Sequence, residues 1–250
     1  MPLRPTHDAK TQRADFQRAK GLELRYAREL RRVAHEIGRI VKGFPVGTAE
    51  SSEKISQVLE RYSEVLKPWA ESVAGRLIAE LDHQDRRSWK AQTKGLSNAL
   101  RAELDKEVSG QSLRRLLDQH VDLITSLPIE AAQRVHKLTI EGLTNSTRAA
   151  EVAKEILETG HVTASRATLI ARTETGRTQT SLMQARAQGI GSPGYIWRTS
   201  SDNDVRPSHK KMAGQFVRWD SPPTLDKLTG HAGCIPNCRC YPEPVIPEEL

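Results

Sequence analysis

The stretch that decides the fold reads Y-I-W-R-T-S-S-D-N-D-V-R-P-S-H-K-K-M-A-G-Q-F (195–216) and continues after a short segment as H-A-G-C-I-P-N-C-R-C-Y-P (231–242). These two pieces contain all three cysteines of the chain, together with two aspartates, two histidines and a tryptophan. Y-I-W-R-T, Q-F-V-R-W and R-C-Y-P-E-P are rich in aromatic and β-branched residues, which predicts three short strands. The last 62 residues also hold eight of the 13 prolines, which indicates a loop-rich β-containing domain.

The N-terminal two thirds of the chain are predicted to be helical. Between residues 10 and 44 the apolar residues recur every three or four positions, which is typical of one long amphipathic helix. Ser51 or Ser52 is expected to cap a second helix. Pro68 lies within the second apolar pattern, and we expect it to kink or split that helix because proline lacks the backbone N–H.

Helical periodicity continues beyond the second helix, in segments at about 95–108, 111–127, 129–143 and 146–159. We expect Pro128 to open one of these helices, since the first turn of a helix does not need the N–H that proline lacks. A last helix is predicted from residue 163 to residue 189. Thr163 or Ser165 lies near its start, and Gly189 should end it.

The last predicted helix carries an unusually polar face. Thr173, Arg177 and Thr180 share this face at helical spacing, so we expect them to form hydrogen bonds with the strands or loops that follow. The fold class predicted is α+β, with a mostly helical N-terminal body and a small C-terminal β-containing domain. The predicted division is a basic amphipathic helix at 1–45, a helical body at 46–162, and a C-terminal domain of one helix plus a small sheet at 163–250.

The positive charge of the chain is concentrated near its start. The net charge is +7, and residues 1–45 hold 11 Lys and Arg against five Asp and Glu. Arg18, Arg25, Arg32 and Arg39 recur every seven residues and form one stripe on the first helix. Such a stripe is either a solvated helix face or a surface that contacts double-stranded DNA or an acidic partner. No apolar run approaches the roughly 18 residues of a membrane span, so we expect none.

The cysteines form part of a candidate metal site. His231, Cys234, Cys238 and Cys240 give the pattern H-x2-C-x3-C-x-C, and zinc in proteins is held by such Cys and His donors. A structural Zn²⁺ would substitute for a core that a small loop-rich domain hardly supplies. Two alternatives stay open: buried free thiols, or a disulfide such as Cys234 to Cys240. His209 is a second candidate for the histidine ligand.

Acidic residues raise a separate possibility of catalysis. Asp202, Asp204, Arg206 and His209 form D-x-D-x-R-x-x-H, and two carboxylates with an imidazole could hold a divalent cation for phosphodiester hydrolysis. The competing interpretation is that S-S-D-N-D forms turns through its side chains and that Arg206 pairs with one of the carboxylates. No nucleophile motif completes an active site, and Trp197 is expected to anchor the sheet.

Five short motifs occur together in the C-terminal third. They are A-R-T-E at 171–174, which includes Arg172 and Glu174, Y-I-W-R-T at 195–199, D-x-D-V-R-P-S-H at 202–209, M-A-G-Q at 212–215 and C-R-C at 238–240. In this order, closing with P-V-I-P, they resemble the phage Mu F-like family of minor head proteins, the head morphogenesis proteins of tailed phages. The resemblance covers about residues 165–247, and Cys234 ahead of C-R-C is unusual in it.

The resemblance implies a virion protein in few copies, inside the head near the portal and in the host cytoplasm during assembly. It implies a role in head assembly or in DNA packaging or ejection. Its partners would be the portal protein, the major capsid or scaffold protein, and double-stranded DNA as a further candidate. The family implies no settled enzymatic activity. The alternative is an enzyme, either a metal-dependent nuclease or a host-directed transferase, built on Asp202, Asp204, Arg206, His209 and Glu174.

Overall fold

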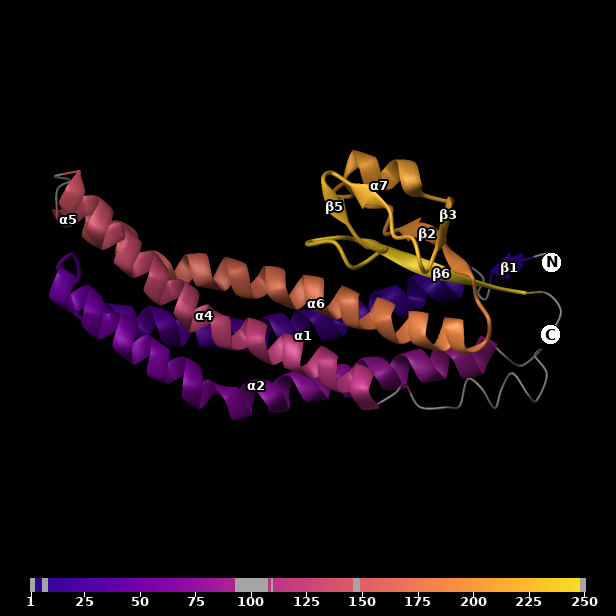
Figure 1. The fold of residues 1–250 in the computed structure, drawn as a ribbon, viewed down its shortest axis with the longest axis horizontal. Coiled ribbons are helices and arrows are strands. Elements are labelled where there is room, and N and C mark those ends of the chain that lie inside the picture. The colour runs from indigo at the N-terminus through magenta and orange to yellow at the C-terminus, as the bar shows by residue number, and fades with distance from the viewer. Residues whose placement is uncertain (1–2, 6–8, 93–107, 109, 146–148, 248–250) are drawn as a thin grey trace. The chain divides into compact units, whose positions relative to one another are not determined.

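The computed structural model describes residues 3–5, 9–92, 108, 110–145 and 149–247. Its helices are α1 (Ala9–Lys42), α2 (Ala49–Gln92), α4 (Gly110–Thr144), α5 (Ala149–Leu157), α6 (Thr159–Gly189) and α7 (Pro207–Met212). Its strands are β1 (Leu3–Pro5), β2 (Gly194–Thr199), β3 (Phe216–Arg218), β4 (Thr224–Leu225), β5 (Leu228–Thr229) and β6 (Cys240–Pro247). The fold is therefore α+β, with a small antiparallel sheet near the C-terminus, as predicted (Figure 1).

The prolines within the helices interrupt them less than the sequence suggests. Pro68 lies inside α2, which is not split, and the predicted helix start at Pro128 is wrong because Pro128 lies inside α4. An interior proline costs about 3 kcal/mol in an isolated helix. The neighbouring Leu127 and Ile124 are fully buried, so packing of α4 offsets this cost. Most of the predicted segment at 95–108 lies outside the described residues.

Two helix starts also differ from the prediction. The side chain that caps α2 is that of Thr48, whose Oγ1 accepts a hydrogen bond from the backbone N–H of Ser51 at 3.2 Å. Helix α6 begins at Thr159, so Thr163 lies inside it. There the Thr163 hydroxyl donates to the carbonyl of Thr159 at 2.8 Å, which supplies the hydrogen-bond acceptor that a threonine hydroxyl in a helix interior needs. The predicted end at Gly189 is confirmed.

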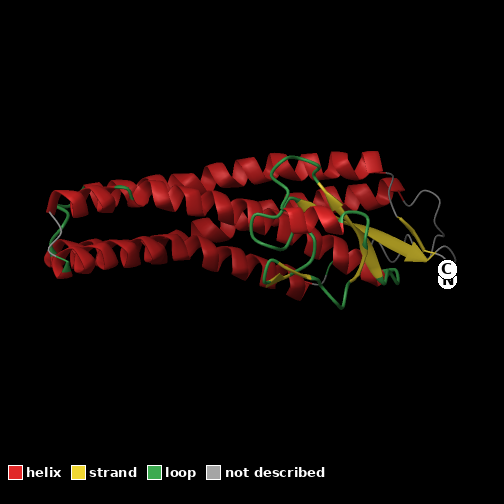
Figure 2. Ribbon diagram, turned by 90° about the horizontal axis from the view of Figure 1, so that it is seen from above, coloured by secondary structure: helices red, strands yellow, loops and turns green. Residues whose placement is uncertain are grey.

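The chain divides into two compact units. The helical unit comprises Arg25–Gly75 and Leu117–Ala171, and the sheet-bearing unit comprises Met1–Leu24, Arg76–Leu116 and Arg172–Leu250. Within the helical unit, segments of α1, α2, α4 and α6 run side by side (Figure 2). Tyr26 and His120 belong to the core of this unit, and the Tyr26 hydroxyl lies 2.9 Å from His120 Nδ1.

The sheet-bearing unit is built on a four-stranded antiparallel sheet in the order β1-β6-β2-β3. The three predicted strands are confirmed as β2, β3 and β6, whereas β1 was not predicted. Aromatic and aliphatic residues together form the core against the sheet, and the C-terminal half of α6 packs there (Figure 1). The core includes Trp89, Met183, Ala187, Ile190, Tyr195, Trp197, Val217 and Trp219. The prediction that Trp197 anchors the sheet is confirmed, since its side chain is fully buried.

An ion-pair cluster joins α2 to α6 inside the sheet-bearing unit. The Arg186 side chain is 2% exposed, and its guanidinium donates to Asp85 and, at 2.5 Å, to Asp82. Asp82 also accepts from Arg86 at 2.8 Å. A buried guanidinium is retained only when carboxylates surround it, because an unpaired buried charge is strongly destabilising. The sequence pattern alone did not indicate this cluster.

Candidate functional site

The site is organised by the loop at 230–239, which we call the cysteine loop, and by the face of α6 beneath it. Thr180 donates its hydroxyl to the carbonyl of Ala232 at 2.8 Å, and the Arg177 guanidinium donates to the carbonyl of Cys234 at 2.8 Å. Thr173 Oγ1 accepts the backbone N–H of Asn237 at 3.1 Å. The predicted role of the polar face of α6 is therefore confirmed: it supplies hydrogen bonds to a loop.

Two glycines allow the cysteine loop to approach α6 closely. A Cβ atom placed on Gly176 would lie 2.7 Å from the carbonyl oxygen of Gly233, which is closer than real Cβ contacts come. Gly233 itself has φ of +87°, a backbone conformation that L side chains rarely adopt. The local sequence thus permits a backbone-to-backbone contact that any larger residue at either position would disturb.

The A-R-T-E motif of α6 helps to hold the cysteine loop. The Arg172 guanidinium donates to Asn237 Oδ1 at 2.6 Å and to Glu23 of α1 at 3.3 Å. Glu174 is 3% exposed and accepts from Arg177 at 2.8 Å, so it orients the guanidinium that holds the loop. Asn237 has φ of 60°, which reverses the chain just ahead of Cys238.

The aspartates form a turn and an ion-pair cluster. Asp202 Oδ1 accepts the backbone N–H of Asp204 at 3.1 Å, and Asp202 Oδ2 accepts the Ser200 hydroxyl at 2.9 Å, which confirms the turn interpretation. The arginine that pairs with them is Arg239, at 2.8 Å from Asp202 and 2.9 Å from Asp204. Partial burial opposes ionisation of Asp202, but the hydrogen bonds from Arg239 and Ser200 lower its pKa below the ordinary value.

The predicted pairing of Arg206 with an aspartate is wrong. Its guanidinium donates to the carbonyl of Pro236 at 3.0 Å, so it too supports the cysteine loop. Arg239 lies in the middle of C-R-C, between two candidate metal ligands. It is Arg239, and not Arg206, that forms ion pairs with the two carboxylates. The spacing of D-x-D-V-R suggested an ion pair between neighbours in the sequence. The fold instead brings Arg239, which lies much later in the chain, to the aspartates.

His209 lies against two of the three cysteines. Its Nδ1 is 3.4 Å from Cys238 Sγ and 3.5 Å from Cys240 Sγ, and the three atoms all lie within 4.8 Å of one another. The ring is 1% exposed and meets Trp197 edge-on, with ring centroids 5.6 Å apart. The hydrogen bond from the Cys240 thiol lowers the pKa of Cys238, and the same contact raises the pKa of Cys240.

The other two predicted metal ligands lie elsewhere in the sheet-bearing unit. His231 Nδ1 is 3.3 Å from the Tyr195 hydroxyl, and its ring packs edge-on against Trp219. Burial lowers the pKa of His231 and raises the pKa of the Cys234 thiol to about 11. Of the four residues proposed from the pattern H-x2-C-x3-C-x-C, the structure therefore brings only Cys238 and Cys240 into one group, and His209 stands where His231 was expected.

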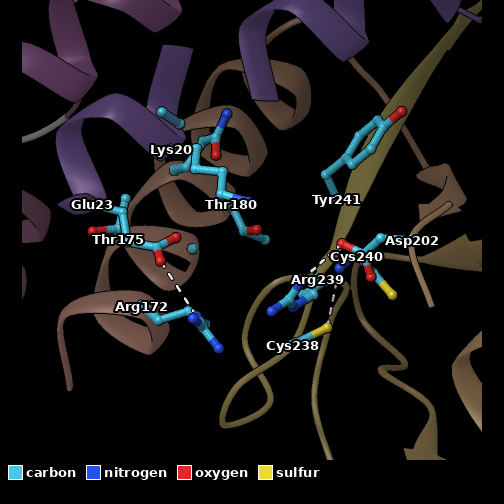
Figure 3. Close-up of a pocket in the computed structure, with 13 residues that line it drawn as sticks. Lys20, Glu23, Arg172, Thr175, Thr180, Asp202, Cys238, Arg239, Cys240 and Tyr241 are labelled. Carbon is cyan, nitrogen blue, oxygen red and sulfur yellow. Dashed lines mark hydrogen bonds and ion pairs between the residues drawn. The ribbon is translucent and has the colours of Figure 1, made fainter. Parts of the chain in front are cut away.

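A small cleft opens beside these cysteines. It has a cavity volume of about 50 Å³ and is lined by side chains of α1, α6, the cysteine loop and β6 (Figure 3). Cys238, Cys240 and the Asp202–Arg239 pair border one side of it, and Arg172 with Glu23 borders the other (Figure 3). A cavity of this volume with charged walls can hold ordered water.

The arginine stripe of α1 is exposed and partly paired within its own helix. Arg32 and Arg39 are 73% and 70% exposed and contact Glu29 at 2.9 Å and Glu36 at 3.4 Å. Arg25 is also exposed. The side chain of Arg18 lies outside the described side chains. Exposed pairs of this kind hold their side chains weakly, so the guanidinium groups can exchange an intrahelical carboxylate for another anion.

The comparison with known families addresses residues from α4 to β6. A protein family described as "Phage Mu protein F like protein" matches residues 133–242. The chain carries a Mu F-like segment. The resemblance inferred from the five motifs is thereby confirmed, and the matched segment extends from the second half of α4 through α6 and the cysteine loop to the start of β6.

Two curated relatives also match this chain. A protein of Haemophilus influenzae, described as uncharacterized, is 28% identical over 208 residues, which cover 82% of this chain and 45% of that protein. An NAD(+)–arginine ADP-ribosyltransferase, EFV, of Enterococcus faecalis is 31% identical over 145 residues, which cover 53% of this chain and 28% of that protein. The chain thus spans less than half the length of these relatives. No solved structure matches the chain.

None of the helices in the described part of the chain has the length and apolar character that a membrane span requires.

The motif residues of the Mu F-like segment share one structural task. Arg172, Glu174 and Arg206 hold the cysteine loop, the two aspartates hold Arg239, and Trp197 supports His209. The group of His209, Cys238 and Cys240 lies at the centre of these contacts.

Proposed function

We propose that this chain is a minor head protein of a tailed phage, associated with the portal vertex and acting in head morphogenesis and in DNA packaging or ejection. The observation that carries the proposal is the Mu F-like match over residues 133–242. The structure supports it in a second way, because the motif residues stabilise a compact loop on α6. A rigid module of this kind suits a role in docking onto a larger assembly.

The alternative of a metal-dependent nuclease or a host-directed transferase is less well supported by the geometry. It requires Asp202, Asp204, Arg206 and His209 to act on one substrate. The two carboxylates instead contact Arg239, the Arg206 guanidinium contacts a backbone carbonyl, and the His209 ring faces the cysteines. The similarity to an ADP-ribosyltransferase covers 28% of that protein.

The partners in this proposal are the portal protein, the major capsid or scaffold protein, and double-stranded DNA. The arginine stripe on α1 is the surface proposed for DNA or for an acidic protein. Its exposed guanidinium groups suit phosphates and carboxylates equally, because both can accept two parallel N–H hydrogen bonds. Binding to DNA through such a stripe should weaken steeply as salt is added.

The proposal is tested by co-expressing the full chain with the portal protein of its phage and purifying the portal oligomer. We expect the chain to co-purify with the oligomer through size-exclusion chromatography at physiological salt. If the chain elutes alone while the portal oligomer is intact, the portal association is wrong. A plasmid-cleavage assay with Mg²⁺ or Mn²⁺ tests the nuclease alternative, with an Asp204→Ala, His209→Ala variant as its control.

The contribution of the stripe is tested with two matched triple variants. Arg25→Gln, Arg32→Gln, Arg39→Gln removes three positive charges from α1, and Lys54→Gln, Lys67→Gln, Lys137→Gln removes three from other exposed positions of the helical unit. We expect only the first variant to lose binding to double-stranded DNA or to the portal oligomer, by about tenfold or more. Equal losses in both variants would show that net charge alone matters.

A further inference from the structure

The group of His209, Cys238 and Cys240 has the dimensions of a zinc site. Tetrahedral zinc is bound at about 2.3 Å from thiolate sulfur and about 2.0–2.1 Å from imidazole nitrogen, which places a nitrogen and a sulfur ligand about 3.6 Å apart. The two nitrogen-to-sulfur distances here are 3.4 Å and 3.5 Å. These two distances match a tetrahedral site to within about 0.2 Å, and the two sulfurs, which lie within 4.8 Å of one another, would approach each other when an ion binds all three atoms.

The three ligand atoms come from separate elements that are each fixed independently. His209 lies on α7, which begins with Pro207, and its ring is held by Trp197. Cys238 lies near the end of the cysteine loop, which the side chains of α6 and Arg206 anchor, and Cys240 begins β6 opposite Thr199 of β2. Preorganised ligands of this kind reduce the cost of metal binding, because little chain entropy is lost when the ion enters.

The donor atoms also suit zinc better than hard cations. Two thiols and an imidazole are soft or borderline donors, and no carboxylate of the described residues joins the group. His209 Nε2 is buried without a hydrogen-bond partner among the described residues, so the polar contacts of the ring are made through Nδ1, on the side of the sulfurs. All three cysteines are free thiols, so no disulfide competes for the two sulfurs.

The fourth coordination position can be assigned from the cleft. Cys238 and Cys240 border the cavity of about 50 Å³ (Figure 3). The ring of Trp197 packs edge-on against His209. A water molecule in this cavity would have the Asp202–Arg239 pair as a neighbour. Zinc bound by three protein ligands commonly takes a water as its fourth.

We propose that the chain binds one Zn²⁺ through His209 Nδ1, Cys238 Sγ and Cys240 Sγ, with a water from the cleft as the fourth ligand. Both thiols lose their protons to solvent on binding, and zinc changes neither its own oxidation state nor theirs. The ion ties α7 to the cysteine loop and to β6. The proposed zinc site lies within the Mu F-like segment. The motif residues would then share one task, which is to hold two sulfurs and an imidazole at ligand distance from the ion.

The test measures metal in the full chain, purified under reducing conditions from cells grown with added zinc. We expect about one equivalent of zinc per chain by elemental analysis, retained on dialysis. After exchange for Co²⁺, we expect the sulfur-to-cobalt charge-transfer band and the visible absorption of a tetrahedral site. Wild-type protein that holds no zinc, or whose Co²⁺ form lacks the charge-transfer band, would overturn the proposal.

Substitutions separate this ligand set from the one that the sequence pattern suggested. Cys238→Ser and Cys240→Ser should each lose most of the bound zinc, whereas Cys234→Ser and His231→Gln should keep it. Loss of zinc in Cys234→Ser and His231→Gln, with retention in His209→Gln, would assign the metal to the other set. Circular dichroism checks that each variant is folded, and chelation of the wild type should lower its melting temperature. An unchanged melting temperature after complete zinc removal would contradict the proposal that the ion ties α7 to the cysteine loop and to β6.

Discussion

A single methyl group on α6 should distinguish a docked cysteine loop from a loose one. Alanine is favoured over glycine by about 1 kcal/mol in a helix interior, so Gly176→Ala would stabilise the chain if nothing lay above it. The added Cβ, however, would lie 2.7 Å from the carbonyl oxygen of Gly233. The obstacle is backbone, which cannot rotate away as a side chain would.

The magnitude follows from the contacts that surround this position. Relief of the clash requires the loop to lift, which strains its hydrogen bonds with Thr173, Arg177 and Thr180. Loss of two such bonds at about 1 kcal/mol each, with overpacking of about 1 kcal/mol, gives a cost of about 3 kcal/mol. After subtraction of the helix gain, Gly176→Ala should destabilise the chain by about 2 kcal/mol.

Urea unfolding followed by tryptophan fluorescence measures this change, since three of the four tryptophans lie in the sheet-bearing unit. Gly21→Ala is the matched control, because Gly21 is an α1 position of the same unit with no atom within 4 Å of the added Cβ. We expect Gly21→Ala to stabilise by up to about 1 kcal/mol. Equal stabilisation by both substitutions would refute the close contact between α6 and the cysteine loop.

Two further predictions concern buried charge. Asp85→Ala should destabilise the sheet-bearing unit by about 3 kcal/mol in urea unfolding, because it removes a carboxylate from the buried Arg186, whereas Asp220→Ala at an exposed pair should change nothing measurable. His120 is fully buried, and burial lowers its pKa to about 4. The unfolded chain therefore binds a proton more readily between pH 6.5 and pH 4, so stability should fall by about 3 kcal/mol as the pH is lowered through this window. His120→Gln should remove this part of the pH dependence and the exposed His136→Gln should not; identical pH profiles for the wild type and His120→Gln would contradict the assignment.

Apolar periodicity predicted the long helices, because burial on one face sets the spacing of apolar residues, and the richness in aromatic and β-branched residues predicted the three strands in the C-terminal third. Helix α7 was not predicted. The prolines were less predictable. Pro128 has the chemistry of a helix start, and only the packing of α4 on its neighbours keeps it in a helix interior. Strand β1 was missed because three residues are too few to show an alternation.

The candidate site was predicted in composition and only partly in its grouping. The sequence pointed to the cysteines and to His209, but spacing alone favoured His231, which is nearer in the chain. The fold brings His209 to Cys238 because α7 and β6 both lie beside β2. In the same way, Arg239 rather than Arg206 pairs with the aspartates, because proximity along the chain does not determine which arginine the fold places beside them.

Arg186 shows what pattern reasoning cannot supply. It lies on α6 and its carboxylate partners lie on α2, about 100 residues earlier in the chain. No local spacing links such residues, and only the packing of the two helices in the sheet-bearing unit does so.

The central claim is that this chain is part of a phage head, and mass spectrometry of purified particles tests it most directly. Procapsids and mature virions of the phage that encodes the chain would be purified, and its peptides quantified against those of the portal and major capsid proteins. The account predicts that the chain is present in both particles, in far fewer copies than the major capsid protein. Its absence from procapsids and virions, with the portal protein readily detected, would contradict the account.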